Sequence, residues 1–227
     1  MTDPNNLRQT LRDRLATAAD EKCREKAERL TSGAKCLGVT VPQIRATAKE
    51  LKKEWSELDF ETICQVADLC FENECREEIL CAIFLLALHK KRLNEIKWDR
   101  INRWTLHLDN WETCDQLSSN ILTPILLNNT NPFMPLEQMA LSANKWERRL
   151  SAATAANLNH GGRTYPTETF RICQQLLTDK EPMVNKAVDW ALREICQKPP
   201  EEVTSLLKQN KNTALEKRLE SYLAKRK

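Results

Sequence analysis

Helix-favouring segments cut at regular intervals are the feature that most constrains this chain. Only 4 of the 227 residues are Gly, and Leu, Ala, Glu, Lys and Arg are abundant, so the segments between breakers favour helix. No segment shows the alternation of apolar and polar residues that is typical of a strand. Breakers rich in Gly, Pro, Asn or Asp lie at 38–42, 59, 73, 94, 109, 128–135, 161–166, 179–182 and 199–200. We therefore predict an all-α fold of short helices joined by short turns.

The spacing of three tryptophans indicates how these helices are arranged. Trp111, Trp146 and Trp190 each fall on a separate predicted helix, 35 and then 44 residues apart, close to the period of about 40 residues in HEAT or armadillo arrays. We predict a single domain over 1–227, a HEAT-like helical-repeat solenoid of stacked antiparallel helix pairs. Its inner helices should line a concave basic groove suited to a long partner. A short basic tail is expected at about 223–227.

The cysteines and the first residues of the chain indicate in which cellular compartment the protein is expected. The 9 cysteines are odd in number and scattered, and no secretory signal precedes them, so we expect reduced thiols. Cys64, Cys70, Cys75 and Cys81 contain no C-x-x-C pair and lie in apolar helical sequence, which favours core packing over a zinc site. No apolar stretch approaches the length of a membrane span. We expect a protein without membrane contact, cytoplasmic near the nucleoid, or nuclear in a eukaryote.

The segment Glu181–Gln197 carries an exposed-looking aromatic residue. One buried stripe accounts for Val184, Ala187, Val188, Ala191, Leu192 and Ile195. Trp190 points away from that stripe, between Lys186 at i−4 and Arg193 at i+3. Either a neighbouring helix covers Trp190, or it forms an aromatic platform in a basic groove suited to nucleic acid.

The segment Asp109–Asn128 predicts a second amphipathic helix. Its buried stripe is Cys114, Leu117, Ile121, Leu122 and Ile125. Trp111 and Asp115 lie four residues apart at the edge of this stripe, so an aromatic face and a partly desolvated carboxylate share one side of the helix. Arg149, on the apolar side of its own helix, is a candidate partner for Asp115, whereas Arg148 should point outward. A purely structural Asp–Arg pair between stacked helices fits the same spacing.

Charge distribution adds further candidates, because the net charge of +3 does not by itself indicate nucleic-acid binding. Residues 141–163 contain Lys145, Arg148, Arg149 and Arg163 against Glu147 alone, and are plausible phosphate contacts. The clusters at 49–53 and 89–97 are interpreted as solvated helix faces, and we assign them no role. The chain has no Gly-rich phosphate loop, G-x-S-x-G or H-E-x-x-H motif, so nucleotide and zinc hydrolysis have little support.

Four motifs, in order, resemble those of the AlkD-type DNA alkylation repair family, which are DNA glycosylases built from HEAT-like repeats. They are LGVTVPQIR at 37–45, NWETCD at 110–115, WERR at 146–149 and VNKAVDWALRE at 184–194. The resemblance extends over most of the chain.

The resemblance implies roles for individual residues. It implies that Trp111, Asp115 and Trp190 line the site beside the damaged nucleotide, and that Arg149 contacts the DNA backbone and holds Asp115. It also places Thr40 and Arg45 in an element expected to contact DNA. Several family members have a side-chain amide just before Thr-Pro, whereas this chain has Thr40, with Val41 in the threonine position. This departure predicts a changed lesion range or a changed contact with the opposite strand.

The function implied is excision of cationic N3-alkyladenine and N7-alkylguanine from duplex DNA by hydrolysis of the N-glycosidic bond, in base excision repair. We expect a monomer with no metal and no small-molecule cofactor. The resemblance further implies that the lesion is not inserted into a deep pocket. One alternative is a non-catalytic HEAT-repeat protein that binds branched or distorted DNA. Another is a protein-binding scaffold, because helical solenoids commonly bind peptides.

Overall fold

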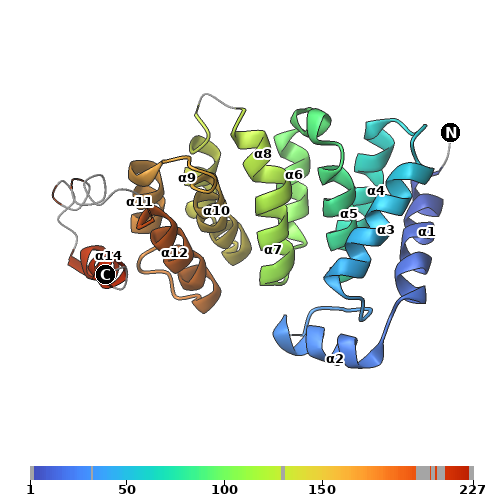
Figure 1. Cartoon of the computed structure of the whole chain (residues 1–227), viewed down its shortest axis with the longest axis horizontal. Helices are drawn as coiled ribbons and strands as arrows, with labels where there is room; N and C mark the ends of the chain where they lie inside the picture. Colours follow the sequence, from blue (N-terminus) through green and yellow to red (C-terminus); the bar gives the residue numbers. More distant parts are fainter. Residues whose placement is uncertain are drawn as a thin grey trace. The chain divides into compact units, whose positions relative to one another are not determined.

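A computed structural model describes residues 3–31, 33–128, 131–197, 205, 208 and 213–224. Over these residues the chain is helical and contains no strand, which confirms the all-α prediction (Figure 1). Contacts divide it into two compact units, Met1–Ile125 and Leu126–Lys227, here called the N-terminal and C-terminal units. The single domain over 1–227 stays a prediction, and most of the predicted basic tail, 225–227, lies outside the described residues. Within that described part, no helix has the length and apolar character that crossing a membrane requires.

The N-terminal unit places its helices in packed pairs. Helix α5 packs against α3, α4 and α7, while α4 also packs against α1 and α6. Thus α3, α5 and α7 form one row, with α4 and α6 behind it (Figure 1). The elements are α1 (Pro4–Thr17), α2 (Glu21–Leu30), α3 (Val41–Glu54), α4 (Phe60–Glu72), α5 (Arg76–Ala87), the 3₁₀ helix η1 (Lys90–Glu95), α6 (Trp98–Leu106), α7 (Trp111–Leu117), the π-helical turn η2 (Ser118–Leu122) and α8 (Thr123–Leu126).

The C-terminal unit is built around α10. This helix packs against α9, α11 and α12, and α12 packs in turn against α11 and α14. Buried Ala152, Ala153, Ala155 and Ala156 keep one part of α10 small, which lets neighbouring helices approach closely. The described helices are α9 (Met134–Ala140), α10 (Lys145–Leu158), α11 (Pro166–Gln175), α12 (Pro182–Ile195) and α14 (Thr213–Ala224).

The predicted breakers at 59 and 109 lie at or next to helix starts, and the predicted buried stripes are correct. Asp59 caps α4 by accepting a 2.7 Å hydrogen bond from the Thr62 amide, and Asn110 caps α7. Every residue of the two predicted stripes is buried. Cys64, Cys70, Cys75 and Cys81 are buried as well, which confirms the core-packing prediction.

Glu77 connects two segments of the N-terminal unit. Its carboxylate is fully buried and accepts hydrogen bonds from the backbone amides of 37, 38 and 39 at 2.8, 3.1 and 3.3 Å. Arg76 donates to it at 2.9 Å. Four N–H donors compensate the desolvation of one charge, so the segment before α3 is fixed to the start of α5.

Gly38 makes the tight turn in this segment possible. Its φ of +92° is unfavourable for a residue with a Cβ atom, and an added Cβ would lie 2.3 Å from the Asp20 carbonyl oxygen. The Asp20 amide also donates to the Gly38 carbonyl at 3.0 Å. The glycine therefore lets the start of α2 and the 37–39 segment pack together.

We predict that Glu77→Gln lowers the free energy of unfolding by about 3 kcal/mol, because a neutral amide leaves the buried Arg76 with Glu112 as its one remaining acid and presents one acceptor oxygen instead of two. Urea unfolding followed by circular dichroism measures the change. The matched control is Glu72→Gln, at an exposed position of α4, which should change stability by less than about 0.5 kcal/mol. Equal stability of the two variants would contradict the assigned role of Glu77.

Candidate functional site

Trp111 and Asp115 lie on one side of α7, as the spacing predicted. The Asn110 side chain accepts hydrogen bonds from the amides of 112 and 113, both at 3.0 Å, and so starts the helix at Trp111. Trp111 is half-buried, and its indole N–H donates at 2.9 Å to the carbonyl oxygen of Leu30, the last residue of α2. Asp115 is half-buried one turn later. An aromatic ring held by its N–H and a partly desolvated carboxylate therefore lie together.

An ion pair fixes the start of α7 to α5. Arg76, which is 6% exposed, bonds Glu112 at 2.7 Å and Glu77 at 2.9 Å. The helix that carries Trp111 and Asp115 is thereby held to the segment that precedes α3.

Thr40 and Arg45 lie in α3 and its cap. Thr40 is exposed at the N-cap, where its amide and hydroxyl donate to Gln43 Oε1 at 3.1 and 2.5 Å. Arg45 is exposed, lies 3.8 Å from the ring centroid of Phe84, and donates to Gln116 Oε1 at 3.2 Å. Arg45 therefore reaches α7 through the residue that follows Asp115.

Arg149 and Arg148 differ from each other in the C-terminal unit. Arg149 is 5% exposed and donates to the Met183 carbonyl at 2.5 Å, which agrees with its predicted position on the apolar side of α10. The prediction that Arg148 points outward is wrong. Its side chain is 18% exposed, pairs with Asp179 at 2.5 Å, and also donates to the Ser142 and Ala143 carbonyls at 3.0 and 2.8 Å.

The pair between Arg148 and Asp179 is a structural one. Burial alone would raise the pKa of Asp179, but hydrogen bonds from Arg148 and from the backbone outweigh burial and lower it. The Asp179 carboxylate also accepts from the Glu181 amide at 2.9 Å, at the start of α12. Arg148 thus joins α10 to the turn before α12, and its predicted contact with DNA stays a prediction.

Trp190 is half-buried and forms a hydrogen bond with an acid. Its indole N–H donates at 3.1 Å to Glu194, which is 8% exposed. His160 lies edge-on to the ring at 6.3 Å between centroids, and its Nε2 is 3.6 Å from the Glu194 carboxylate. Lys186 and Arg193 are exposed on α12, and Arg193 lies 5.8 Å from the ring centroid of Tyr222 in α14. The ring is therefore held at its N–H, as Trp111 is.

The predicted site residues fall into two local groups. Trp111, Asp115, Thr40 and Arg45 belong to the N-terminal unit, and Arg149, Trp190, Lys186 and Arg193 to the C-terminal unit. The structure brings Trp111 and Asp115 together on α7, and it places Arg149 and Trp190 on the packed helices α10 and α12. A contact between Asp115 and Arg149 stays a prediction.

Four supporting residues were missed from the sequence. Glu194 stands four residues after Trp190, so helical spacing could have found it. Arg76 and Glu112 are 36 residues apart, and no local pattern signals their pairing. The sequence identifies Gln116 only as a polar residue of α7 and does not predict its bond with Arg45.

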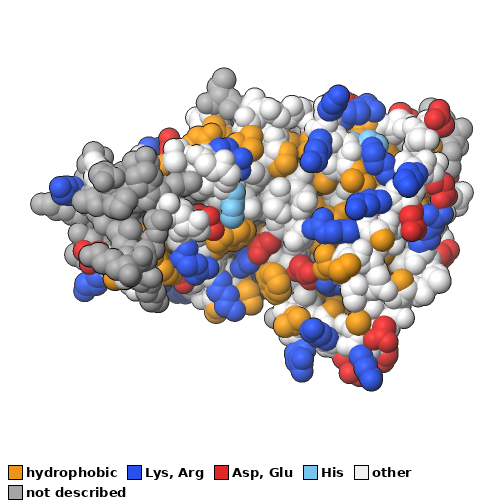
Figure 2. Space-filling model, in the orientation of Figure 1, with side chains coloured by type: hydrophobic (Ala, Val, Ile, Leu, Met, Phe, Trp, Pro, Cys, Tyr) orange, Lys and Arg blue, Asp and Glu red, His pale blue; other side chains and the backbone are white. Residues whose placement is uncertain are grey.

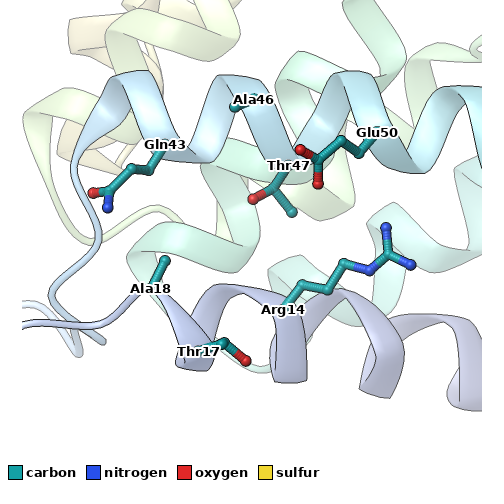
Figure 3. Close-up of a pocket in the computed structure, with 7 residues that line it drawn as sticks. All are labelled: Arg14, Thr17, Ala18, Gln43, Ala46, Thr47 and Glu50. Atoms are coloured by element: carbon teal, nitrogen blue, oxygen red, sulfur yellow. The ribbon is translucent and has the colours of Figure 1, made fainter.

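Two other features offer little reactive chemistry. A hollow of about 430 Å³ between α1 and α3 is lined by one cation, one acid and small or polar side chains, with Arg14 and Glu50 on opposite walls (Figure 3). Burial raises the pKa of the Cys64 thiol to about 12 and of Cys75 to about 11, so both stay protonated at neutral pH. No group of three or more His, Cys, Asp or Glu in the described residues is arranged to hold a metal ion.

Comparisons with known proteins agree with this picture of the fold. A family model described as DNA alkylation repair enzyme matches residues 11–221. A solved structure from Enterococcus faecalis, described as a predicted DNA alkylation repair enzyme, is similar with a TM-score of 0.69 and 19% identity, over 91% of this chain and 97% of that one. An engineered protein, 18% identical over 99% of this chain and 96% of its own, has a TM-score of 0.38, which supports no argument. Among curated protein sequences none matches.

We predict that Arg148→Met lowers the free energy of unfolding by about 2 kcal/mol, because it removes a charged hydrogen bond and leaves Asp179 without its counter-charge. Urea unfolding at pH 7 measures this. Arg171→Met is the control in the same unit, since Arg171 and Glu137 are 58% and 32% exposed and such pairs contribute little. A control variant that loses as much stability would contradict the prediction.

The stability difference between wild type and Arg148→Met should also depend on pH. The folded-state pKa of Asp179 lies below its ordinary value of 3.8, so the pair stabilises the fold above about pH 4 and loses this effect as the pH falls through the folded-state pKa. Urea midpoints at pH 7, 5 and 3 test this. The difference should persist at pH 5 and shrink at pH 3, and a constant difference would exclude Asp179 as the group responsible.

Proposed function

Because this chain belongs to the DNA alkylation repair enzyme family, whose model covers 11–221, we propose that it is a DNA glycosylase acting on alkylated purines in duplex DNA. Membership supports a role in alkylation repair and a helical-repeat solenoid fold. The reaction and the substrate are the proposal. One observation carries them furthest: Trp111 and Asp115 lie half-buried on the same side of α7.

The chemistry of N-glycosidic cleavage explains why such a pair suits this reaction. Alkylation at N3 of adenine or N7 of guanine makes the base cationic, so it departs with little help from a general acid. Positive charge then develops on the deoxyribose, in an oxocarbenium-like transition state. A nearby carboxylate and the electron-rich faces of aromatic rings stabilise this charge.

We propose a separate task for Trp111 and for Asp115 on α7. The Trp111 indole N–H is held by the Leu30 carbonyl, so the ring face is oriented before substrate arrives. Asp115 is partly desolvated, which strengthens its attraction for a developing positive charge. The same carboxylate could accept a proton from the attacking water. We assign both effects to Asp115.

Trp190 and Arg149, in the C-terminal unit, are proposed to take the roles that the resemblance implies for them. The bond from Trp190 to Glu194 fixes the plane of the second aromatic ring. The bond from Arg149 to the Met183 carbonyl fixes its guanidinium beside α12. Fixed groups need no reorganisation as charge develops, and this preorganisation is the main source of electrostatic catalysis.

The departure at Thr40 is proposed to alter contact with the DNA rather than the chemistry. Thr40 is exposed, and its hydroxyl is already bonded to the amide oxygen of Gln43. The amide missing at position 40 is therefore present one turn later in α3. We propose that Gln43 presents its NH₂ group to the duplex in place of the missing residue.

We predict that Asp115→Asn lowers the rate of base release at least ~100-fold, because an amide cannot stabilise the cationic sugar by charge. The measurement is single-turnover release of N7-methylguanine from a duplex, with duplex affinity measured in parallel. Asp99→Asn is the control, at an exposed position of α6 in the same unit, and should retain the wild-type rate.

The same assay separates the alternative functions. Release by wild type with an unchanged rate in Asp115→Asn would remove Asp115 from the chemistry. Absence of release with salt-sensitive duplex binding would favour the non-catalytic DNA-binding module. Absence of any duplex binding at low salt would favour the protein-binding scaffold.

A further inference from the structure

A basic hollow in the N-terminal unit joins two segments that are distant in the sequence. It encloses about 300 Å³ and is lined by Arg45, Lys49, Phe84, Ala87, Leu88, Lys90 and Asn120. Arg45 and Lys49 are one turn apart on α3, and Lys90 starts η1, just after α5. Figure 2 shows Lys and Arg side chains gathered over α3 and α5 with apolar side chains between them. Three cations and no acid line this hollow.

The cations of the basic hollow differ from most of the arginines elsewhere in the unit. Each of Arg8, Arg12, Arg14, Arg76, Arg92 and Arg100 has an acidic partner. Among the described residues, no ion pair is formed by Arg45, Lys49 or Lys90. Like charges gathered without counter-charges repel one another. Their arrangement therefore favours an anion that comes from outside the chain.

Arg45 is the best ordered of the three cations. Its guanidinium lies over the ring of Phe84, a side chain that is 3% exposed, and one of its N–H groups bonds Gln116. A guanidinium has five N–H donors, and the structure shows no further bond from Arg45 among the described residues. Gln116 also accepts from Asn120 Nδ2 at 3.0 Å, so the π-helical turn η2 supports this geometry.

We propose that the basic hollow binds the phosphodiester backbone of duplex DNA through Arg45, Lys49 and Lys90, and that it is a phosphate-contact site beside α7. The resemblance implied a DNA contact for Arg45, whereas Lys49 and Lys90 had been interpreted as solvated. The inference rests on the proposed function, because it takes duplex DNA as the partner.

The shape and spacing of the basic hollow favour a polyanion over a small phosphate compound. Side chains four residues apart on a helix have Cβ atoms about 5–6 Å apart, so Arg45 and Lys49 present two positive groups in line along α3. Lys52 and Lys53 continue the positive charge of α3 beyond the hollow. A row of cations matches the regular charges of a nucleic-acid strand, and binding would release the counterions condensed on it.

The test is the salt dependence of binding to an undamaged duplex. Each phosphate contact contributes about 0.9 to the slope of log Kd against log salt concentration. The double variant Lys49→Gln, Lys90→Gln should reduce that slope by about 2 and weaken binding at least ~10-fold near 0.1 M NaCl. Fluorescence anisotropy between 50 and 300 mM NaCl measures both quantities.

Two matched variants make the result specific. Lys97→Gln with Arg103→Gln removes the same charge from two exposed positions, the N-cap of α6 and α6 itself, and should keep the wild-type slope. Lys49→Arg with Lys90→Arg keeps the charges and should also keep the slope. Thermal melting verifies that each protein is folded, as expected for exposed side chains.

The outcomes separate this inference from the proposed function. Wild type that does not bind duplex would overturn both proposals. Wild type that binds and releases base, with the same slope in both Gln double variants, would overturn the basic hollow alone. A loss of binding to poly-glutamate, but not to duplex, in Lys49→Gln, Lys90→Gln would replace DNA with an acidic protein partner.

Discussion

Two adjacent buried carboxylates at the start of α5 organise the N-terminal unit. Glu77 binds the amides of 37–39, and the fully buried Glu78 accepts from Arg8 and Asn73, both at 2.8 Å, and from Arg12. Burying a carboxylate costs free energy unless hydrogen bonds and counter-charges replace its hydration. Loss of one of these contacts should therefore weaken the whole cluster. Through Arg76 and Glu112 the same cluster reaches α7. The position of Trp111 and Asp115 thus depends on charges buried outside the proposed site.

Helical periodicity predicted the apolar part of this fold well, because an amphipathic stripe is a local property. The stripe of α12 and the caps at Asp59 and Asn110 needed only neighbours within four residues. The buried acids could not be found this way. Glu77 and Glu78 look like ordinary first-turn acids, and apart from Arg76 and Asn73 their partners lie 38 to 70 residues away in sequence. Arg148 was misjudged for the same reason, since Asp179 lies 31 residues later.

In the candidate site too, contacts between residues one helical turn apart could be predicted from the sequence, whereas contacts between distant residues could not. Spacing predicted that Trp111 and Asp115 share a side of α7, and it would have linked Trp190 to Glu194. The π-helical turn at 118–122, which follows α7 directly, has no sequence signature of this kind. Gln116 takes part in that turn through Asn120 and also bonds Arg45. Such turns occur frequently at functional sites, where they change which side chains share a face.

The net charge of this chain is a poor guide to anion binding, because a cation that is already paired with an acid of the fold attracts an external anion only weakly. The overall charge of +3 does not by itself indicate affinity for a polyanion. Most arginines of the N-terminal unit form ion pairs with acids of the same fold. These paired arginines therefore add little to the positive electrostatic potential at the surface. Lysines on α3 and at the start of η1 have no such partners among the described residues, and their field is not cancelled nearby. Arg45, fixed on Phe84, gives that field one oriented hydrogen-bonding group. A nearly neutral chain can therefore present a local positive surface where its structure leaves cations unpaired and holds one of them in place, and this is the basis of the DNA-backbone contact that we propose.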